Sequence, residues 1–303
     1  MRSDYKLAKF KRNKNYLLKQ SFVLLIIFLV LFFLGYKIIN KIKENRKPEP
    51  VTEIIPREEI NVTILEGWRN SDIVNYFSDK WDEEDILDYI GERNIDNSKN
   101  EQELSINWEE DYNFLKDKPD NMSLEGYLFP DTYRIYASSS PAELVSRMLT
   151  NFDNKLTSEM RADIKKQGKT IHEIITMASI IEKEAPIFAQ KDLKDAKIVS
   201  GIFWNRLEIG MALQSDATLS YILNDNKPAH SGSELSIDSP YNTYKYPGLI
   251  PGPICNPGIA AIEAAIYPSD TNYLYFLTTL DGKEIYYART HDEHVRNKYL
   301  YLK

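Results

Sequence analysis

Hydrophobic and polar positions along the chain follow two periods, which predict a mixture of helices and strands. Apolar residues recur every three to four positions in 141–151 and 171–184, the spacing of one buried helix face. Alternation around 62–64 predicts a short strand, and the apolar runs at 273–279 and 283–288 flank an Asp-Gly pair, which predicts a hairpin. Because no regular strand–helix repeat is present, the pattern indicates an α+β fold.

The N-terminal region departs from both periods, because residues 21–36 contain no charged side chain. Extended to residue 39, this run reaches the roughly 20 residues that a helix needs to cross a bilayer. We therefore predict a transmembrane helix over 21–39. The alternative is a cleaved signal peptide, but no small-residue cleavage motif follows the run. Residues 40–58 are polar and contain three prolines, which indicates a linker.

Charge predicts the orientation of this helix. Residues 1–20 carry seven basic side chains and one acidic side chain. Basic segments beside a membrane helix stay on the cytoplasmic side, so residues 1–20 are the predicted cytoplasmic tail. The remaining residues would then form a body outside the cytoplasm, anchored by a single pass through the plasma membrane.

Composition excludes several other classes of function. The whole chain has a formal net charge of −7, so the part after the basic tail is strongly acidic, which argues against a nucleic-acid partner. Cys255 is the only cysteine, which excludes an internal disulfide and a metal site built from cysteines. His291 and His294 are three apart, but no further metal ligand accompanies them. We expect no metal and no cofactor.

Two carboxylates at the end of the predicted helix 171–184 are the first candidates for chemistry. In a helical projection, Glu182 falls on the apolar stripe between Ile175 and Ala178, whereas Glu184 falls at the other border of the apolar surface. A carboxyl group on an apolar stripe loses hydration, so its pKa should be raised. A carboxylic acid that stays protonated near neutral pH can act as a general acid.

A purely structural interpretation of these glutamates remains open from the helix geometry alone. Both side chains could reach solvent or pair with Lys183 and Lys191, and the projection places Lys183 and Ser179 on a polar back. Negative charge at the C-terminal end of a helix opposes the helix dipole, however, which is a cost that a structural glutamate would not need.

A long loop and a short motif before it provide further candidates. Residues 238–258 contain five prolines and three glycines, and loops of this length are often functional. Asn242, Thr243, Tyr244 and Asn256 offer polar groups beside aromatic rings, which suits a sugar. A structural wrap over the core is the alternative, and Asn256 is also placed to cap a following helix.

The motif before the loop contains Gln214 and Asp216. Asp216 is most simply the N-cap of a short helix that ends at Leu223, and a role in binding a ligand is the second interpretation of both residues.

Four blocks of sequence together resemble the MltG (YceG-like) family of membrane-anchored endolytic murein transglycosylases. They are LEGYLFPDTY at 124–133, ASIIEKE at 178–184, FWNRLEIGMALQSDATLSY at 203–221 and SPYNTYKYPGLIPGPICNPG at 239–258. The order and spacing of the four blocks are far more specific than any one of them.

This resemblance implies a bacterial envelope protein whose substrate is peptidoglycan. It implies a small LysM-like subdomain, assigned to 59–118, ahead of a YceG-like catalytic domain, assigned to 119–303. It also implies that Glu182 is the catalytic acid and that cleavage leaves 1,6-anhydro-N-acetylmuramic acid ends. Glu184 is the second candidate for the acid. The residues expected to bind substrate or support the site are Glu125, Glu184, Gln214, Asp216, Asn242, Thr243, Tyr244 and Asn256. Peptidoglycan synthases are possible partners.

Two other functions remain open at this point. A scaffold without enzymatic activity would keep the anchor and bind glycan but would tolerate the loss of Glu182. A muramidase that uses water would differ only in its product, and would need a second carboxylate, for which Asp216 is the first candidate.

Overall fold

The computed structural model describes residues 2–45, 57–93, 95, 104–120, 122–184, 193–225, 227, 229–280 and 282–302, with side chains from residue 19 onward. Its internal contacts divide the chain into two units, Met1–Pro56 and Arg57–Lys303.

The first unit is one long helix, α1 (Arg2–Asn45). Its segment Lys19–Glu44 is long and apolar enough to cross a membrane, and contains the predicted span 21–39. No part of the most apolar window is buried by the described residues. The helix continues to Asn45, so the first residues of the predicted linker 40–58 are helical, and most of the rest of that linker lies outside the described residues.

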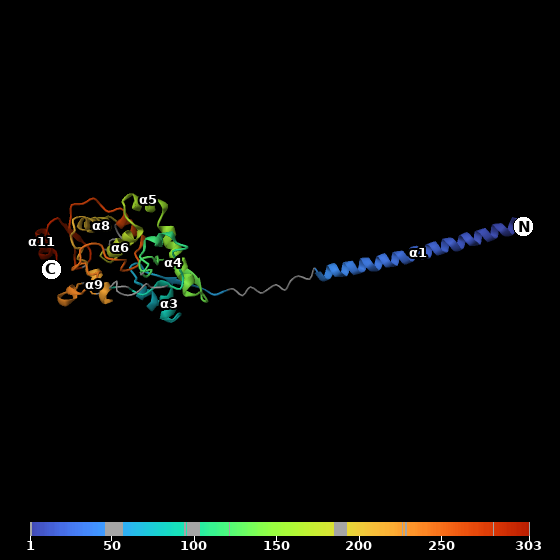
Figure 1. The fold of residues 1–303 in the computed structure, drawn as a ribbon, viewed down its shortest axis with the longest axis horizontal. Coiled ribbons are helices and arrows are strands. Elements are labelled where there is room, and N and C mark those ends of the chain that lie inside the picture. The colour runs from blue at the N-terminus through green and yellow to red at the C-terminus, as the bar shows by residue number, and fades with distance from the viewer. Residues whose placement is uncertain are drawn as a thin grey trace. The chain divides into compact units, whose positions relative to one another are not determined.

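The second unit mixes helices with two small sheets, as the α+β prediction requires (Figure 1). In chain order its elements are β1 (Glu59–Thr63), α2 (Asn70–Tyr76), α3 (Glu83–Ile90), the 3-10 helix η1 (Asn113–Asp117), β2 (Thr132–Tyr136), α4 (Pro141–Lys155), α5 (Ser158–Lys166), α6 (Ile171–Glu184), α8 (Leu193–Glu208), α9 (Asp216–Leu223), the 3-10 helix η2 (Gly232–Ser236), α10 (Ile259–Ile266), β3 (Tyr275–Thr278), β4 (Ile285–Ala288) and α11 (His291–Tyr301).

Strand β1 pairs with β2 in antiparallel register, with Val62 opposite Tyr133 and Ile60 opposite Ile135. The apolar residues of β1 alternate with polar ones, which is why one face of this sheet can be buried. The pairing joins the segments 59–118 and 119–303 in one sheet. The boundary between these two predicted domains, and the LysM-like character of the first, therefore remain predictions.

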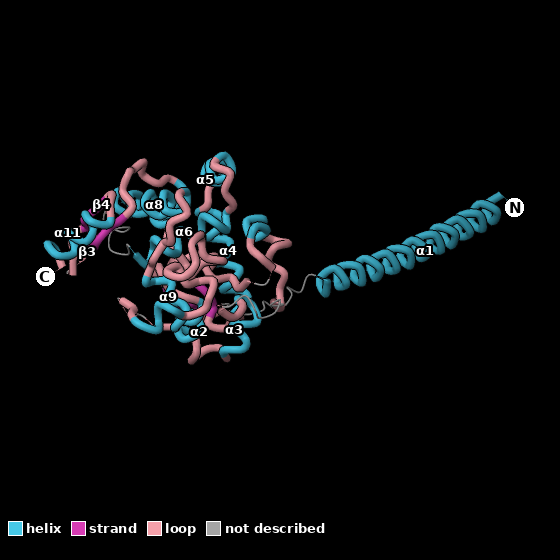
Figure 2. The backbone as a smooth tube through the Cα atoms, turned by 60° about the vertical axis from the view of Figure 1, so that its left-hand side comes forward, coloured by secondary structure: helices cyan, strands magenta, loops and turns pink. Residues whose placement is uncertain are grey.

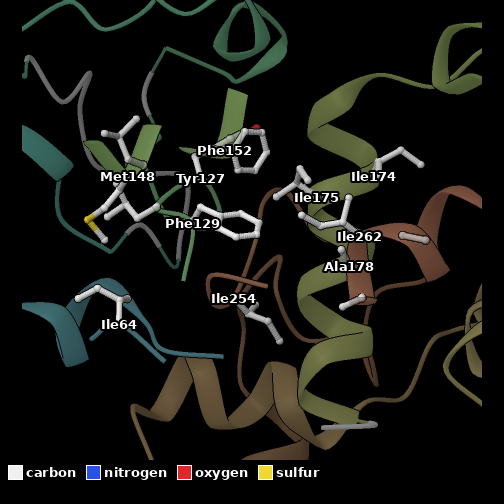
Figure 3. Close-up of a cluster of buried hydrophobic side chains, with 14 of the residues drawn as sticks. Ile64, Tyr127, Phe129, Met148, Phe152, Ile174, Ile175, Ala178, Ile254 and Ile262 are labelled. Atoms are coloured by element: carbon white, nitrogen blue, oxygen red, sulfur yellow. The ribbon is translucent and has the colours of Figure 1, made fainter. Parts of the chain in front are cut away.

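Helix α6 runs through the core of the second unit, in contact with α10, α8 and α9. Figure 2 shows it inside the folded body with α8 and α9 beside it. Ile174, Ile175 and Ala178 belong to one buried apolar cluster with Ile254 and Ile262, which surrounds α6 (Figure 3). A capping box begins the helix: Thr170 Oγ1 accepts from the backbone N–H of Glu173 at 3.1 Å, and Glu173 accepts from the N–H of Thr170 at 2.8 Å.

The prediction of a polar back on α6 is wrong for Ser179, which is fully buried. Its hydroxyl donates to the carbonyl of Thr176 at 2.7 Å and accepts from the N–H of Ile254 at 3.0 Å. The loop 238–258 therefore covers a face of α6 that a single-helix projection assigns to solvent. The helix is buried nearly all round, and a small hydroxyl residue satisfies the loop backbone where they touch.

The predicted hairpin is present, since β3 and β4 pair in antiparallel register with Leu277 opposite Tyr286. Helix α11 packs against both strands, and Thr290 Oγ1 caps it by accepting from the N–H of Glu293 at 3.2 Å.

Candidate active site

Glu182 lies on the last turn of α6 with 3% of its surface exposed. Its Oε2 accepts a hydrogen bond from the backbone N–H of Gly258 at 3.1 Å. Burial raises the pKa of Glu182 to about 7, and the nearby charge of Glu66 also raises it, while the Gly258 hydrogen bond and Lys183 act in the opposite direction. The desolvated carboxyl expected from the apolar stripe is therefore present.

Two glycines allow other parts of the chain to approach Glu182. Gly67 has a φ of +75°, and a Cβ there would lie 3.6 Å from Glu182 Cγ and 3.7 Å from Lys183 Nζ. At Gly258, a Cβ would lie 2.0 Å from Glu66 Oε1, so the Glu66 carboxylate lies directly against this glycine. Glu66 and Glu182 therefore both lie beside Gly258.

Backbone pairing holds this arrangement. The N–H of Gly67 donates to the carbonyl of Asn256 at 2.9 Å, and the N–H of Asn256 donates to the carbonyl of Trp68 at 2.8 Å. Sequence reasoning missed Glu66, which reaches the site only through this pairing. The only local signal is an acidic residue beside a turn glycine, and that pattern is too common to single it out.

Glu184 faces a different neighbourhood from Glu182. Its Oε1 accepts from the hydroxyl of Ser215 at 2.5 Å, next to the start of α9. Burial raises the pKa of Glu184, the Ser215 hydrogen bond lowers it, and the charge of Asp216 raises it. The divergence of the two side chains follows from their spacing of two residues on a helix.

Glu125 is a third buried acid, 4% exposed, and both of its carboxyl oxygens accept from the backbone N–H of Asn70, at 3.0 and 3.2 Å. Burial raises the pKa of Glu125 to about 8, and the Asn70 hydrogen bond and Arg69 only partly offset this. Glu125 thus connects the loop before β2 with the start of α2, consistent with a supporting role.

Asn256 connects three loops rather than capping a helix. Its Oδ1 accepts from the N–H groups of Gly126 at 2.9 Å and Leu128 at 3.0 Å, and its Nδ2 donates to the carbonyl of Trp68 at 3.0 Å. The predicted cap is wrong, because α10 begins at Ile259 and Gly258 is its N-cap residue. The side chain is instead used to satisfy buried backbone donors on 124–128.

Asn242 and Thr243 are also used within the protein. Asn242 is fully buried, and its Nδ2 donates to the carbonyls of Leu235 at 3.1 Å and Ile237 at 2.8 Å. Thr243 Oγ1 accepts from the N–H of Ser215 at 2.9 Å. These contacts agree with the structural-wrap interpretation of the loop 238–258, and direct sugar binding by these two side chains remains a prediction.

The remaining predicted residues gather near Glu184. Gln214 is exposed with a φ of +49°, and its N–H donates to the carbonyl of Thr243 at 3.1 Å. Burial raises the pKa of the Tyr244 phenol, and the nearby charges of Asp216 and Glu184 raise it further. The predicted cap at Asp216 is wrong, because α9 begins at Asp216 and Ser215 is its N-cap residue. Asp216 Oδ1 accepts from the N–H of His230 at 3.2 Å.

A cavity of about 270 Å³ opens beside these residues. Its lining residues are Arg69, Lys183, Glu184, Asp216, Ala217, Ser220 and Lys227. Glu184 and Asp216 line the cavity directly. Glu182 does not line it, but the next residue, Lys183, does, and Gly67 lies beside both Glu182 and Lys183. The structure therefore brings Glu182, Glu184, Asp216 and Tyr244 to one region, and adds Glu66, Arg69 and Lys183 to the set.

Two other interpretations from the sequence are the pairing of the glutamates with lysine and a metal site at the two histidines. Pairing of the glutamates with Lys191 lies outside the described residues. His291 and His294 lie beside the ring of Tyr275, with ring-centre distances of 6.0 and 5.3 Å. The expectation of a site without metal remains a prediction.

The fold and the site define an α+β protein in which a buried, raised-pKa glutamate ends a core helix beside a polar cavity. The YceG-like family matches residues 36–299, and the chain belongs to this family.

Known relatives carry a consistent description. The chain is 38% identical over 179 residues to an endolytic murein transglycosylase of Bacillus subtilis (strain 168), covering 59% of this chain and 48% of that protein. It is 37% identical over 188 residues to one of Streptococcus pneumoniae (strain D39), covering 60% of this chain and 33% of that protein. The chain thus spans about half or less of the length of these relatives.

A solved structure shares the fold. The crystal structure of the yceG-like protein lmo1499 from Listeria monocytogenes superposes with a TM-score of 0.65 and 31% sequence identity. The match covers 86% of this chain and 80% of that chain.

Proposed function

We propose that the protein is a membrane-anchored lytic transglycosylase that cleaves peptidoglycan within its glycan strands. The observation that carries this proposal is Glu182, a carboxyl group buried at the end of α6 with a pKa raised to about 7. Such a group is protonated at neutral pH in a substantial fraction of molecules, as a general acid must be. The names of the relatives supply the substrate class.

The proposed reaction uses one carboxyl group twice. Glu182 donates its proton to the glycosidic oxygen that leaves the anomeric carbon of N-acetylmuramic acid. The carboxylate then removes the proton from the 6-hydroxyl of the same sugar as that oxygen bonds to the anomeric carbon. The products are a strand ending in 1,6-anhydro-N-acetylmuramic acid and a strand with a free N-acetylglucosamine hydroxyl. Because the nucleophile belongs to the substrate, proximity replaces a positioned water.

The direction of the two helix-end glutamates supports this route. Glu182 points to Gly258 and Glu184 points to Ser215, so the pair does not face one bond from opposite sides. We assign Glu184, Asp216 and Tyr244 to substrate contact at the cavity. Glu125, Asn242, Thr243 and Asn256 are assigned to support of the site, and Gln214 to the exposed edge of the cavity loop.

The wider assignments belong to the same proposal. The helix α1 anchors the protein in a bacterial plasma membrane through residues 21–39, with residues 1–20 in the cytoplasm. Residues 59–118 act as a LysM-like glycan-binding subdomain, and 119–303 as the catalytic domain. Peptidoglycan synthases are the proposed partners in cell-wall growth.

Hydrolysis is the second candidate function, because Glu66 lies beside Gly258 together with Glu182. A glycosidase that uses water usually has two carboxyl groups at its active site. Asp216, the candidate from the sequence, lies beside Glu184 instead. Glu66 is thus the residue that a hydrolytic reaction would use as its base.

Product analysis separates these functions. Full-length protein in detergent is incubated with uncrosslinked glycan strands in heavy-oxygen water, and the fragments are weighed by mass spectrometry. We expect internal cleavage, ends lighter by one water than hydrolytic ends, and no heavy oxygen incorporated. Muramic acid ends that carry heavy oxygen would establish the hydrolase, and intact strands bound to the protein would establish the scaffold.

A further inference from the structure

The cavity beside α6 contains an arginine whose hydrogen-bonding capacity is only partly used. Arg69 is 5% exposed. Its Nη1 donates to Asn224 Oδ1 at 3.4 Å, and its Nη2 donates to the carbonyl of Asp225 at 3.1 Å. Its Nε is buried and has no hydrogen-bond partner among the described residues. A buried charged donor without a partner is costly unless a ligand supplies the acceptor.

A second cation lines the same cavity. Lys183 follows Glu182 on α6, and its Nζ lies beside Gly67, where a Cβ would be 3.7 Å away. Within the part of the chain that the structure describes, no carboxylate forms an ion pair with Lys183. Lys227, also at the cavity, is different, because Glu234 at 2.5 Å and Asp225 at 3.4 Å already neutralise it.

The acids at the cavity have other partners. Glu184 Oε1 accepts from the hydroxyl of Ser215, and burial raises its pKa. Asp216 accepts from the N–H of His230 and lies 3.5 Å from the ring Nδ1 of that histidine. Arg69 and Lys183 are therefore the cations at this cavity that form no ion pair with a carboxylate of the described residues.

We propose that Arg69 and Lys183 form a subsite for a carboxylate carried by the muramic acid side of the substrate. An arginine with a lysine beside it is suited to a carboxylate, because the guanidinium supplies directed N–H donors and the ammonium supplies charge. The volume of about 270 Å³ is below that of typical pockets for larger ligands, so it fits one sugar substituent or a short peptide group.

This inference rests on the proposed function, since it places the subsite beside the bond that Glu182 protonates. Two groups on peptidoglycan have the required chemistry. One is the lactyl carboxylate of muramic acid, which is free only when the peptide has been removed. The other is a carboxylate within the attached peptide.

The test compares three sets of glycan strands with full-length protein in detergent. The first set carries its peptides, the second has had its peptides removed by an amidase, and the third has every carboxylate converted to an amide. Initial rates are measured for wild type, for Lys183→Met and for the control Lys166→Met, an exposed lysine on α5. Assays are run at pH 5.5, because Lys183 lowers the pKa of Glu182 and its removal would otherwise change the fraction of acid.

We expect Lys183→Met to raise KM about 10-fold on strands with carboxylates, the lower end for a charge-assisted hydrogen bond, with kcat nearly unchanged. On the fully amidated strands wild type should show the same raised KM, and Lys183→Met should cause no further loss. Lys166→Met should behave as wild type throughout. A preference of wild type for the first or the second set identifies the peptide or the lactyl carboxylate as the ligand.

Two results would overturn the subsite. One is an equal loss for Lys183→Met on amidated and carboxylate-bearing strands, which would place the effect of Lys183 on Glu182 or on folding. The other is no loss on any strand. Thermal unfolding of Lys183→Met, compared with wild type, separates the folding explanation from the rest.

Failure of the proposed function has a different signature. If wild type cleaves none of the strands, the subsite is tested by NMR titration with N-acetylmuramic acid and with N-acetylmuramyl-dipeptide, each compared with its fully amidated derivative. Binding of an acid form but not of its amide, weakened in Lys183→Met and by added salt, supports a carboxylate subsite in a protein that is not a transglycosylase. Equal binding of acid and amide in both comparisons rejects the subsite.

Discussion

At the scale of single residues, α6 carries two glutamates whose environments give them different properties. Glu182 accepts a hydrogen bond from the backbone N–H of Gly258, and the carboxylate of Glu66 lies against the same glycine. Glu184 meets a hydroxyl and lines the cavity. The first environment favours a proton donor that must release and recover its proton. The second favours a side chain that contacts the ligand.

Replacing each glutamate by glutamine separates these roles. Glu182→Gln should fold normally and lose at least about 100-fold in kcat, the lower end for a positioned general acid. Glu184→Gln should lose less and show more of its effect in KM. The measurement is the rate of anhydro-end formation by mass spectrometry. The assignment is reversed if Glu184→Gln is inactive while Glu182→Gln remains active.

The dependence of activity on pH follows from the direction of the Glu182 shift. The acid form is required, so activity should fall as the pH rises through about 7. Glu66→Gln removes a neighbouring negative charge that raises the pKa of Glu182, so the alkaline limb should move to lower pH. Glu159→Gln, an exposed acid on α5, is the control and should leave the limb unchanged. An unchanged profile for Glu66→Gln would contradict the proximity of the two carboxylates.

Glu125 should make stability depend on pH. Its folded-state pKa of about 8 is above the ordinary 4.5, so the folded protein holds the proton more tightly than the unfolded chain. The resulting stabilisation is fully present below pH 4.5 and is lost as the pH rises towards 8, at about 1.4 kcal/mol per pKa unit. Glu125→Gln should therefore show a smaller loss of unfolding free energy between pH 5 and pH 8.5 in urea titrations. Equal losses in both proteins would show that Glu125 is not desolvated.

At the scale of elements, close approach between loops and helices depends on a few glycines. A Cβ at Gly126, where φ is +90°, would lie 2.4 Å from Pro253 Cβ and 3.0 Å from Ile175 Cγ2. The loop before β2 therefore packs directly between the loop 238–258 and α6. This packing joins the loop that contains Glu125 to the loop that contains Asn256.

Gly126→Ala should destabilise the fold through both backbone strain and overlap. Gly168→Ala is the matched control, because Gly168 also has a positive φ, +71°, but a Cβ there would meet nothing within 4 Å. The strain contribution is shared, so the difference between the two variants measures the overlap, and we expect about 1–3 kcal/mol. Urea unfolding of both variants gives the comparison, and equal stabilities would show that the loop packing adapts without cost.

Local patterns predicted the elements well where an element depends on its own sequence. The helix 141–151 within α4 and the hairpin β3–β4 are of this kind. The burial of Glu182 could also be predicted, because its position on the apolar stripe fixes which face of the helix its side chain occupies.

Contacts between distant segments could not be predicted in the same way. Ser179 is buried by a loop more than 70 residues away, and Asn256 satisfies donors about 130 residues away. Glu66 is in the site only because the backbone around Gly67 pairs with Asn256. Nothing local in the sequence specifies such pairings, so the apparent cap at Asn256 and the polar back at Ser179 were the simplest local interpretations.

At the scale of the whole molecule, charge and hydrophobicity are separated along the chain. The apolar segment Lys19–Glu44 is not buried by the described residues, and it follows a tail with seven basic side chains. A bilayer would remove this apolar surface from water, at about 25 cal/mol per Å². The seven basic side chains before this segment favour the cytoplasmic side of the membrane.

The protein should therefore insert with residues 1–20 in the cytoplasm and the second unit outside. In cells stripped of their wall, added protease should digest residues 57–303 and spare an epitope tag at the N-terminus. Permeabilised cells are the control, in which both are digested. Because basic residues near the helix bias its orientation, replacing Lys9, Lys11, Arg12 and Lys14 by glutamine should produce a mixed population in which part of the body is protected. Protection of the body in the unaltered protein would place it in the cytoplasm, away from peptidoglycan, and would remove the basis for the proposed activity.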